Sequence, residues 1–300
     1  MVTGATGFLG RYVVQSVAKL PHAVVAALSR KATPIATVNA RQLRVGDWEH
    51  LGPQFWRRHG ASHVDVLIHL AAATPKRARE ESARLCGQNV ALTERLLNSL
   101  PSVPGTVVFA STIDVYGDPQ RGAVVTEQTP LDPVGPYAEG KVACEKLCTD
   151  YARAGSSVSV LRYGHMYGPG EEAYDRLITR AIRRALAGEA LELIGSGDVL
   201  RDYLHVRDAA EATRRIVMRP TYCAGVVNVV RGTSVSVESV LRILARISGR
   251  SIVRLGQESP VRSFTFDASK LREAAGTWRH VELEDGLREE FEYMRALRES

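Results

Sequence analysis

Val2-Thr3-Gly4-Ala5-Thr6-Gly7-Phe8-Leu9-Gly10-Arg11 is the stretch of sequence that decides the fold. Its glycines stand three residues apart, after a short apolar start and before apolar residues at helical spacing. A chain that turns sharply from a strand into a helix, with its backbone close to a ligand, needs residues without a Cβ. The free N–H groups and the positive dipole end of such a helix attract a pyrophosphate. We therefore expect a dinucleotide cofactor to contact Gly4, Thr6, Gly7, Phe8 and Leu9.

Length and composition limit the class of protein. The chain has 300 residues, of which 45% are hydrophobic and 24% charged, as expected for a soluble globular protein of one large or two closely joined domains. No apolar run is long enough to span a membrane, and no signal peptide precedes the glycines. Four cysteines are too few for a disulfide framework, so we expect a cytoplasmic protein.

The net charge of +6 comes from basic residues that are scattered along the chain and form no nucleic-acid-binding motif. A phosphate-bearing small substrate, or a general bias toward arginine, explains the sign of the charge as well as nucleic acid does. We therefore expect neither a nucleic acid nor a membrane as a partner.

Apolar strands alternate with helical patterns along the first half of the chain. Strands are predicted at 22–29, 42–45, 64–70 and 106–110, and a long helix at 79–100. Residues 64–70 are almost continuously apolar, as in a central parallel strand that is buried on both faces. The alternation predicts an α/β fold with a doubly wound parallel sheet, the Rossmann architecture. Only three residues precede the first glycine, so the first strand is short, either through truncation or because the sheet is thin there.

The end of the second predicted strand indicates which dinucleotide binds. Where an acidic residue would bind a ribose 2′-hydroxyl and favour NAD, the sequence has Ser29, Arg30 and Lys31. A hydroxyl and two cations suit a 2′-phosphate, so we predict NADP, with NAD as the weaker alternative. Arginines after strands are also expected by chance in so arginine-rich a chain. After the 64–70 strand, Ala71 and Ala72 are small enough to let the cofactor lie across the strand end.

Tyr137 and Lys141 carry the predicted chemistry. They lie four residues apart near the start of a predicted helix over 135–153, so they share one helix face. The ammonium, together with a nicotinamide cation, is expected to lower the pKa of the phenol and make it an acid/base for a sugar hydroxyl or carbonyl. Thr112, after the 106–110 strand, can hydrogen-bond the same oxygen. A Tyr-x-x-x-Lys pair alone is frequent by chance, and its place after the glycine stretch makes it informative.

The chain resembles the extended short-chain dehydrogenase/reductase family, within it the nucleotide-sugar epimerase, dehydratase and reductase group. The resemblance covers nearly the whole chain. It implies that Asp47 contacts the adenine, that Leu70 and Asn89 contact the cofactor, and that Thr74 contacts the substrate. It also implies that Arg201 binds the diphosphate of a nucleotide sugar. The matching segments are Gly4, Gly7 and Gly10; Asp47; Leu70-Ala71-Ala72; Thr112, Tyr137 and Lys141; Leu161-Arg162; Tyr167-Gly168-Pro169-Gly170; and Arg201-Asp202-Tyr203-Leu204-His205-Val206 with Asp208.

Two departures from the family pattern bear on the reaction. Dehydratases of this family carry Thr-Asp-Glu where this chain has Thr112, Ile113 and Asp114. Isoleucine cannot deliver a proton, and Asp114 is one methylene shorter than the glutamate, so dehydration is disfavoured. His165 replaces the usual asparagine before the Tyr-Gly-Pro turn. It is either a substrate contact that titrates near neutral pH or a packing replacement, and both interpretations stay open.

Residues 1–160, with parts of 200–232, are predicted to form the dinucleotide-binding domain, and 161–300 mainly a smaller α/β substrate-binding lobe. In this lobe Arg262 is a candidate second diphosphate ligand, and a helix over 173–186 carries Arg176 and three further arginines. A solvated face is the first interpretation of these arginines, and a diphosphate contact the second.

Two features outside the motifs have ordinary explanations. Cys144 and Cys148 lie four apart, but no other ligands cluster with them, so buried small side chains are favoured over zinc and no metal site is predicted. The helices 79–100 and 135–153 carry apolar stripes that would either pair with a second copy, as in the dimers of the resembling family, or belong to the core. We expect a homodimer.

These observations predict an NADP-dependent reductase of a nucleotide-diphosphate 4-keto-6-deoxy sugar. Tyr137 would donate the proton, Lys141 would lower the pKa of Tyr137 and hold the nicotinamide ribose, and Thr112 would orient the carbonyl oxygen. The alternative is an NAD-dependent nucleotide-sugar 4-epimerase, which recycles one bound cofactor. A binding protein of the same fold without catalysis is disfavoured by the complete trio of Thr112, Tyr137 and Lys141.

Overall fold

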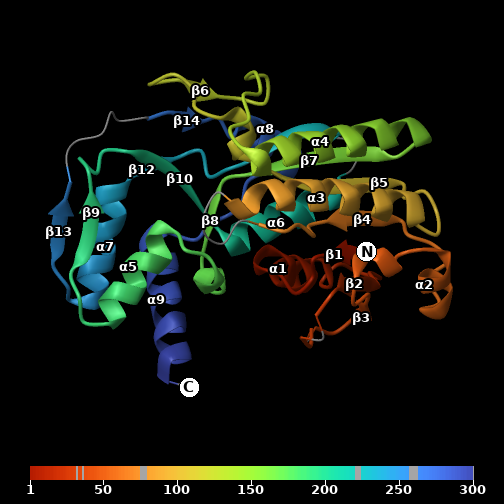
Figure 1. The fold of residues 1–300 in the computed structure, drawn as a ribbon, viewed down its shortest axis with the longest axis horizontal. Helices are drawn as coiled ribbons and strands as arrows, with labels where there is room; N and C mark the ends of the chain where they lie inside the picture. Colours follow the sequence, from red (N-terminus) through yellow and green to blue (C-terminus); the bar gives the residue numbers. More distant parts are fainter. Residues whose placement is uncertain (32, 36, 75–79, 220–223, 257–262, 300) are drawn as a thin grey trace.

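The computed structural model describes residues 1–31, 33–35, 37–74, 80–219, 224–256 and 263–299, with no side-chain description for residues 80–83. Its main feature is a seven-stranded sheet in the order β11-β7-β5-β4-β1-β2-β3, in which every neighbouring pair is parallel (Figure 1). The predicted doubly wound parallel sheet is thereby confirmed. The strands are β1 (Val2–Thr3), β2 (Val25–Ser29), β3 (Ala40–Arg44), β4 (Val66–His69), β5 (Thr106–Thr112), β7 (Ser157–Tyr163) and β11 (Gly225–Val229).

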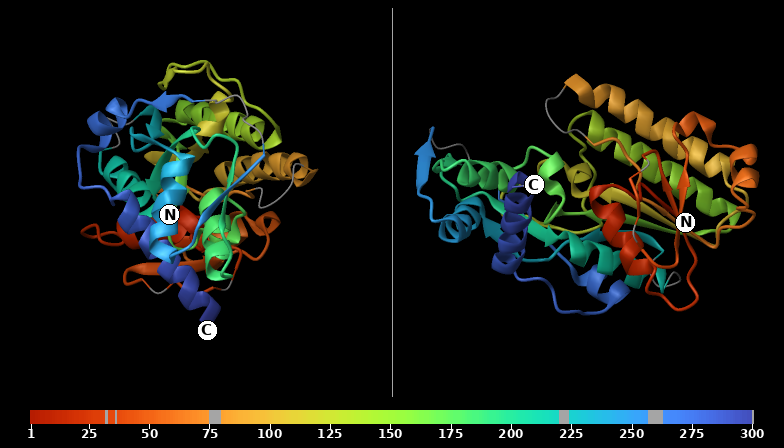
Figure 2. Two further views of the ribbon diagram at one scale, coloured as in Figure 1. Left: turned by 90° about the vertical axis from the view of Figure 1, so that its left-hand side faces the viewer. Right: turned by 90° about the horizontal axis from the view of Figure 1, so that it is seen from below.

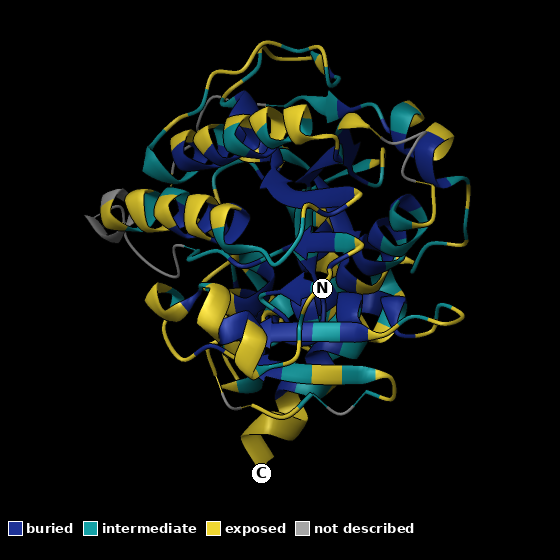
Figure 3. Ribbon diagram, turned by 90° about the vertical axis from the view of Figure 1, so that its right-hand side faces the viewer, coloured by how far each residue is buried: buried dark blue, intermediate teal, exposed yellow. Residues whose placement is uncertain are grey.

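Helices cover both faces of this sheet, as a parallel sheet requires (Figure 2). On one face α1 (Phe8–Val17), α6 (Val206–Val217) and α8 (Ser269–Ala275) pack over a core that includes Val13, Val14 and Ile216. On the other face α2 (Pro53–Arg58), α3 (Glu80–Ser99) and α4 (Pro136–Tyr151) pack over Trp56 and Leu96. Figure 3 shows the central strands between these layers as buried, the edge strand β3 as mostly intermediate or exposed, and the outer helix faces as exposed.

A second group of elements lies beyond the carboxyl ends of the strands. It contains α5 (Leu177–Leu186), α7 (Val237–Ser248) and α9 (Leu283–Glu299) around their own core of Ile182, Leu241 and Leu287. Its short sheets pair β9 (Leu191–Ile194) with β13 (Ile252–Leu255), and β10 (Leu200–His205) with β8 (His165–Tyr167) and β12 (Ser234–Ser236). A further ribbon joins β6 (Val124–Val125) to β14 (Thr265–Phe266).

The helix predicted over 173–186 begins later than expected. α5 starts at Leu177, and Glu171–Ala173 form a separate 3₁₀ turn that follows Gly170 at φ +104°. The backbone of Arg176 is extended, and its N–H donates to the Thr179 hydroxyl at 3.1 Å. Arg176 is therefore the capping residue before the first turn of α5. Arg176 therefore does not share the helix face of the other three arginines.

Within the described ranges, no helix combines the length and apolar character that a membrane crossing requires.

Candidate functional site

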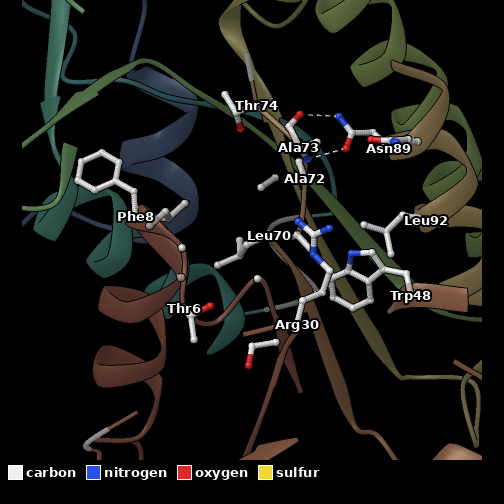
Figure 4. Close-up of a pocket in the computed structure, with 18 of the residues that line it drawn as sticks. Thr6, Phe8, Arg30, Trp48, Leu70, Ala72, Ala73, Thr74, Asn89 and Leu92 are labelled. Atoms are coloured by element: carbon white, nitrogen blue, oxygen red, sulfur yellow. Dashed lines mark hydrogen bonds between the residues drawn. The ribbon is translucent and has the colours of Figure 1, made fainter. Parts of the chain in front are cut away.

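A cavity of about 570 Å³ runs along the carboxyl ends of β1, β2, β4 and β5 (Figure 4). Phe8 lies at one end of the view in Figure 4, and Trp48 and Arg30 lie together at the other. The structure brings the whole set of predicted cofactor contacts to this cavity. Its lining includes Gly4, Thr6, Gly7, Phe8, Leu9, Ser29, Arg30, Lys31, Asp47, Leu70, Ala71, Ala72, Asn89, Tyr137 and Lys141, and also Thr74.

The glycine turn fits the predicted pyrophosphate. Gly4 has φ +68°, and a Cβ there would lie 2.7 Å from the Ala71 nitrogen. A Cβ on Gly10 would lie 2.0 Å from the Gly4 oxygen, so α1 can approach β1 this closely only with glycine. Gly7 caps α1 without a side-chain hydrogen bond, and no acidic residue occupies the first helical turn. The first N–H groups of α1 are thus free of side-chain acceptors at the wall of the cavity, as an anion site requires.

Asn89 fixes the segment after β4. Its Oδ1 accepts the Ala73 N–H at 2.7 Å and its Nδ2 donates to the Ala73 oxygen at 2.9 Å (Figure 4). Asn89 is buried, so these two bonds decide the path of the backbone beside the cavity. The side-chain amide of Asn89 thus binds the backbone of Ala73, and its predicted contact with a cofactor stays a prediction.

The end of β2 is held by a residue that the sequence analysis missed. Gln42 on β3 donates from Nε2 to the Ser29 hydroxyl at 3.1 Å and to the Thr33 oxygen at 2.9 Å. The Ser29 hydroxyl in turn donates to the Lys31 oxygen at 3.0 Å. Ser29 therefore shapes the turn, while the exposed side chains of Arg30 and Lys31 are left for a ligand.

Tyr137 and Lys141 lie on one face of α4, as predicted. Gly135 at φ +88° and Pro136 in the first turn start this helix directly before them. The Lys141 amine donates to the Ala110 oxygen at 2.7 Å and lies 5.9 Å from the centroid of the Tyr137 ring. Burial lowers the pKa of Lys141 to about 8. The amine thus joins α4 to β5 and places a partly titrating cation beside the phenol.

In the protein without a cofactor the pKa of Tyr137 is raised, whereas the sequence analysis expected a lowered pKa. Burial raises it, the carboxylate of Asp114 raises it further, and Arg176 and a hydrogen bond with Thr74 act in the opposite direction. The expected lowering depended on a nicotinamide cation as well as on Lys141. Without that cation the phenol stays protonated at neutral pH.

Thr112 ends β5, and its hydroxyl accepts the Asp114 N–H at 3.2 Å. It is buried and lines neither this cavity nor the second one described below. Its neighbour Ser111 does line the larger cavity.

The second cavity, of about 330 Å³, gathers three of the predicted substrate contacts, Asp114, His165 and Arg201. Burial lowers the pKa of His165 to about 4, with Asp114 opposing this shift and Arg201 and Arg176 supporting it. The His165 Nδ1 atom is buried and has no partner among the described residues. Of the two interpretations left open for His165, the lowered pKa disfavours titration near neutral pH, and the ring is a neutral donor or acceptor. Arg262 lies outside the described residues.

Two buried polar groups beneath the site were also missed. His69 lies between the Thr3 hydroxyl, at 2.7 Å from Nδ1, and the Thr93 hydroxyl, at 3.1 Å from Nε2. Glu145 on α4 pairs with Arg162 on β7 at 2.7 Å. The one signal in the sequence was a charged residue, Arg162, within the apolar run 157–163.

Three of the four cysteines lie in the part of the chain that the structure describes. Cys86, Cys144 and Cys148 are free thiols, and the Cys144 sulfur accepts the Thr93 hydroxyl at 3.4 Å. Within the described part of the chain, no group of three acidic, histidine or cysteine side chains is arranged to hold a metal ion.

Comparison with known proteins places this site in a family. The sequence model of the NAD dependent epimerase/dehydratase family matches residues 1–229. An uncharacterized UDP-glucose epimerase of Bacillus subtilis, YtcB, is 30% identical over 243 residues, which are 78% of this chain and 75% of YtcB. A dTDP-4-dehydro-6-deoxy-D-allose reductase of Streptomyces bikiniensis is 27% identical over 280 residues, covering 87% of this chain and 85% of the reductase.

A solved structure agrees with these matches over the whole length. MoeE5, in complex with UDP-glucose and NAD, superposes with a TM-score of 0.77 at 28% identity, covering 99% of this chain and 98% of MoeE5. The glycine turn, the Tyr137–Lys141 pair and the matched length lead to one family. This chain belongs to the NAD-dependent epimerase/dehydratase family and is an NAD(P)-dependent oxidoreductase of the extended short-chain dehydrogenase/reductase group.

Proposed function

We propose that the protein is an NADP-dependent 4-ketoreductase of a nucleotide-diphosphate 4-keto-6-deoxy sugar. The observation that carries the proposal is the end of β2, where Arg30 and Lys31 expose two cations at the adenosine end of the cavity. Two cations favour a 2′-phosphate. A net reductase consumes NADPH, whereas an epimerase recycles its cofactor. The relative from Streptomyces bikiniensis, named as a reductase of such a keto sugar, supports the same choice.

The bound dinucleotide would supply a hydride for the keto carbon. Tyr137, which burial keeps protonated, donates its phenolic proton to the developing alkoxide. Lys141 stabilises the phenolate that remains and binds the nicotinamide ribose. Thr112 would position the carbonyl oxygen from the end of β5 through its O–H, which stays available to donate while its oxygen accepts the Asp114 N–H.

The substrate would bind across the second cavity. Arg201, and Arg262 with it, would bind the diphosphate, while Asp114, His165 and Thr74 contact the sugar. In this arrangement residues 1–160, with parts of 200–232, hold the dinucleotide, and 161–300 mainly hold the substrate. A homodimer in the cytoplasm remains a prediction.

An NAD-dependent nucleotide-sugar 4-epimerase is the second candidate. YtcB carries an epimerase name, and MoeE5 was solved with NAD and UDP-glucose. The Ser29 hydroxyl, occupied within its own turn, offers no specific contact to a 2′-phosphate, which also leaves room for NAD.

The two candidates separate in one experiment. NADPH or NADH is mixed with dTDP-4-keto-6-deoxyglucose, and cofactor absorbance is followed. Stoichiometric loss of NADPH supports the reductase, and a Tyr137→Phe variant should lose about 10²-fold or more of that rate. Interconversion of UDP-glucose and UDP-galactose without net cofactor loss would instead establish the epimerase.

A further inference from the structure

Arg176 lines the larger cavity and lies near His165, which lines the second one. It lines the larger cavity together with Tyr137 and Tyr174, and its charge acts on both Tyr137 and His165. The guanidinium lies 4.9 Å from the centroid of the Tyr174 ring. A cation in this position faces the space that the sugar end of a nucleotide sugar would occupy.

The bonds of Arg176 to the protein leave most of its donors unused. Its Nη1 lies 3.5 Å from the Glu171 Oε1 and 3.5 Å from the Met166 oxygen, and its side chain is 43% exposed. A guanidinium has five N–H donors, so several remain for an oxygen-rich ligand.

Glu171 is an unusual partner for a half-exposed arginine, because its own side chain is only 2% exposed. Beside it lies a second buried carboxyl group, Glu290 of α9, whose Oε2 accepts the Gly168 N–H at 3.1 Å. The two carboxyl groups are close enough for the charge of Glu171 to act on Glu290, and two neighbouring buried carboxylates are unfavourable unless one of them carries a proton. Burial raises the pKa of both groups, and their proximity raises that of Glu290 further, so this proton is retained at neutral pH.

No other donor competes for this pair. The Glu171 Oε2 and Glu290 Oε1 atoms are buried, and no N–H group or hydroxyl of the described residues donates to them, so a proton held between the two carboxyl groups is the donor that they lack. Burying two carboxyl groups lowers the stability of the fold. Glu290 accepts an N–H of the Tyr167–Gly170 turn, and Glu171 pairs with Arg176. The pair therefore connects α9 to the cation in the lining of the larger cavity.

We propose that Glu171 is a positioning residue, which holds the Arg176 guanidinium in the lining of the larger cavity for the sugar hydroxyl or phosphate oxygens of a nucleotide sugar, and that Glu290 fixes Glu171 through a shared proton. The inference rests on the proposed nucleotide-sugar substrate, and it adds α9 to the elements that build the substrate site.

The test measures binding of UDP-glucose and dTDP-glucose, and separately of NADPH, by calorimetry, with steady-state KM and kcat for the keto sugar. Arg176→Ala should weaken nucleotide-sugar binding about tenfold, the value of a charge-assisted hydrogen bond, and leave NADPH binding unchanged. Glu171→Gln should weaken it severalfold in the same way, and should have no further effect in the Arg176→Ala background. KM should rise with little change in kcat.

The neighbouring carboxylate supplies a matched control. Glu172 lies next to Glu171, but no ion pair or hydrogen bond joins its side chain to Arg176 in the described structure, so Glu172→Gln should weaken nucleotide-sugar binding much less than Glu171→Gln does. Glu290→Gln keeps a donor for Glu171 and should stay near the wild type, whereas Glu290→Leu should reproduce Glu171→Gln. If a Glu171 variant fails to fold, Arg176→Lys tests the same contact from the exposed side, with an expected loss close to that of Arg176→Ala.

Several results would overturn the inference. The first is that Glu171→Gln weakens nucleotide-sugar binding further in the Arg176→Ala background. The second is that the variants weaken NADPH binding as much as nucleotide-sugar binding. The third is that Glu172→Gln weakens nucleotide-sugar binding as much as Glu171→Gln does. A wild-type protein that binds nucleotide sugars but does not reduce the keto sugar would contradict the proposed function alone. A wild-type protein that binds neither nucleotide sugar would contradict both.

Discussion

Removal of one partner from the buried ion pair of Glu145 and Arg162 should destabilise the protein more than removal of both. The side chains of Glu145 and Arg162 are 9% and 5% exposed, and two parallel bonds of 3.0 and 2.7 Å join them. The pair continues through Tyr116, whose hydroxyl accepts from Arg162 at 2.9 Å and donates to Asn228 at 2.7 Å. On the other side Ser111 donates to Glu145.

The magnitude follows from what each change leaves behind. Glu145→Gln or Arg162→Met alone leaves one buried charge without a partner, at a cost of about 3–5 kcal/mol. The double variant Glu145→Leu with Arg162→Met removes both charges and leaves only the hydroxyls of Ser111 and Tyr116 short of one bond each. At about 1 kcal/mol for each hydroxyl, the expected cost is about 2 kcal/mol.

Equilibrium unfolding in urea measures these differences, with the fluorescence of the buried Trp56 as a probe and circular dichroism as an independent one. A double variant that loses the sum of the two single losses would refute the reasoning. So would a loss below about 1 kcal/mol in either single variant, because a desolvated charge would then have found another partner.

Three further predictions concern the supports of the cavity. Burial lowers the pKa of His69 from 6.5 to about 3, so its contribution to stability is complete above pH 6.5 and declines toward pH 3. The stability deficit of His69→Gln relative to the wild type should therefore be about 2 kcal/mol smaller at pH 5 than at pH 7.5 in urea unfolding, and an equal deficit at both values would contradict a neutral buried ring. Asn89→Ala loses both bonds to Ala73 and should weaken cofactor binding about tenfold in a fluorescence titration, without a comparable change in nucleotide-sugar binding. Gly170→Ala places a Cβ 1.1 Å from the Arg11 Nη2 at φ +104° and should lower stability by about 2 kcal/mol or more in thermal unfolding, and an unchanged Tm would show that Arg11 moves aside freely.

The parts of the fold that sequence could predict are those in which neighbours along the chain decide the geometry. The spacing of Gly4, Gly7 and Gly10 reflects a close approach of backbones within ten residues, and the structure confirms why a Cβ is excluded there. The residues predicted to contact the cofactor after β2, β3 and β4 line one cavity, because the carboxyl ends of parallel strands meet at one edge of a sheet, and their contact with a cofactor stays a prediction.

The features that the sequence did not predict depend on residues that are distant from each other along the chain. Glu145 and Arg162 pair between a helix and a strand, and Glu290 meets Glu171 across more than a hundred residues. No pattern of neighbouring residues predicts which two side chains meet in either pair. Arg176 was placed on a helix face because arginines recur at helical spacing after it, whereas the Thr179 hydroxyl starts the helix one residue later. The two interpretations of His165 stayed open because the sequence does not show its burial, which lowers the pKa of the ring.

Tyr137 and Lys141 show why residue spacing predicts position better than charge state. Four residues of helix fix both side chains on one face, but the amine donates its hydrogen bond to the Ala110 oxygen and the phenol stays protonated through burial. A protonated phenol is the state that a proton donor needs, which agrees with the proposed reduction of a carbonyl. Abstraction of a proton from a sugar hydroxyl needs the phenolate, and Asp114 beside Tyr137 opposes it. The Asp114→Asn variant should therefore accelerate oxidation of a sugar alcohol relative to reduction at pH 7, and an equal effect on both directions would show that Asp114 acts through substrate binding instead.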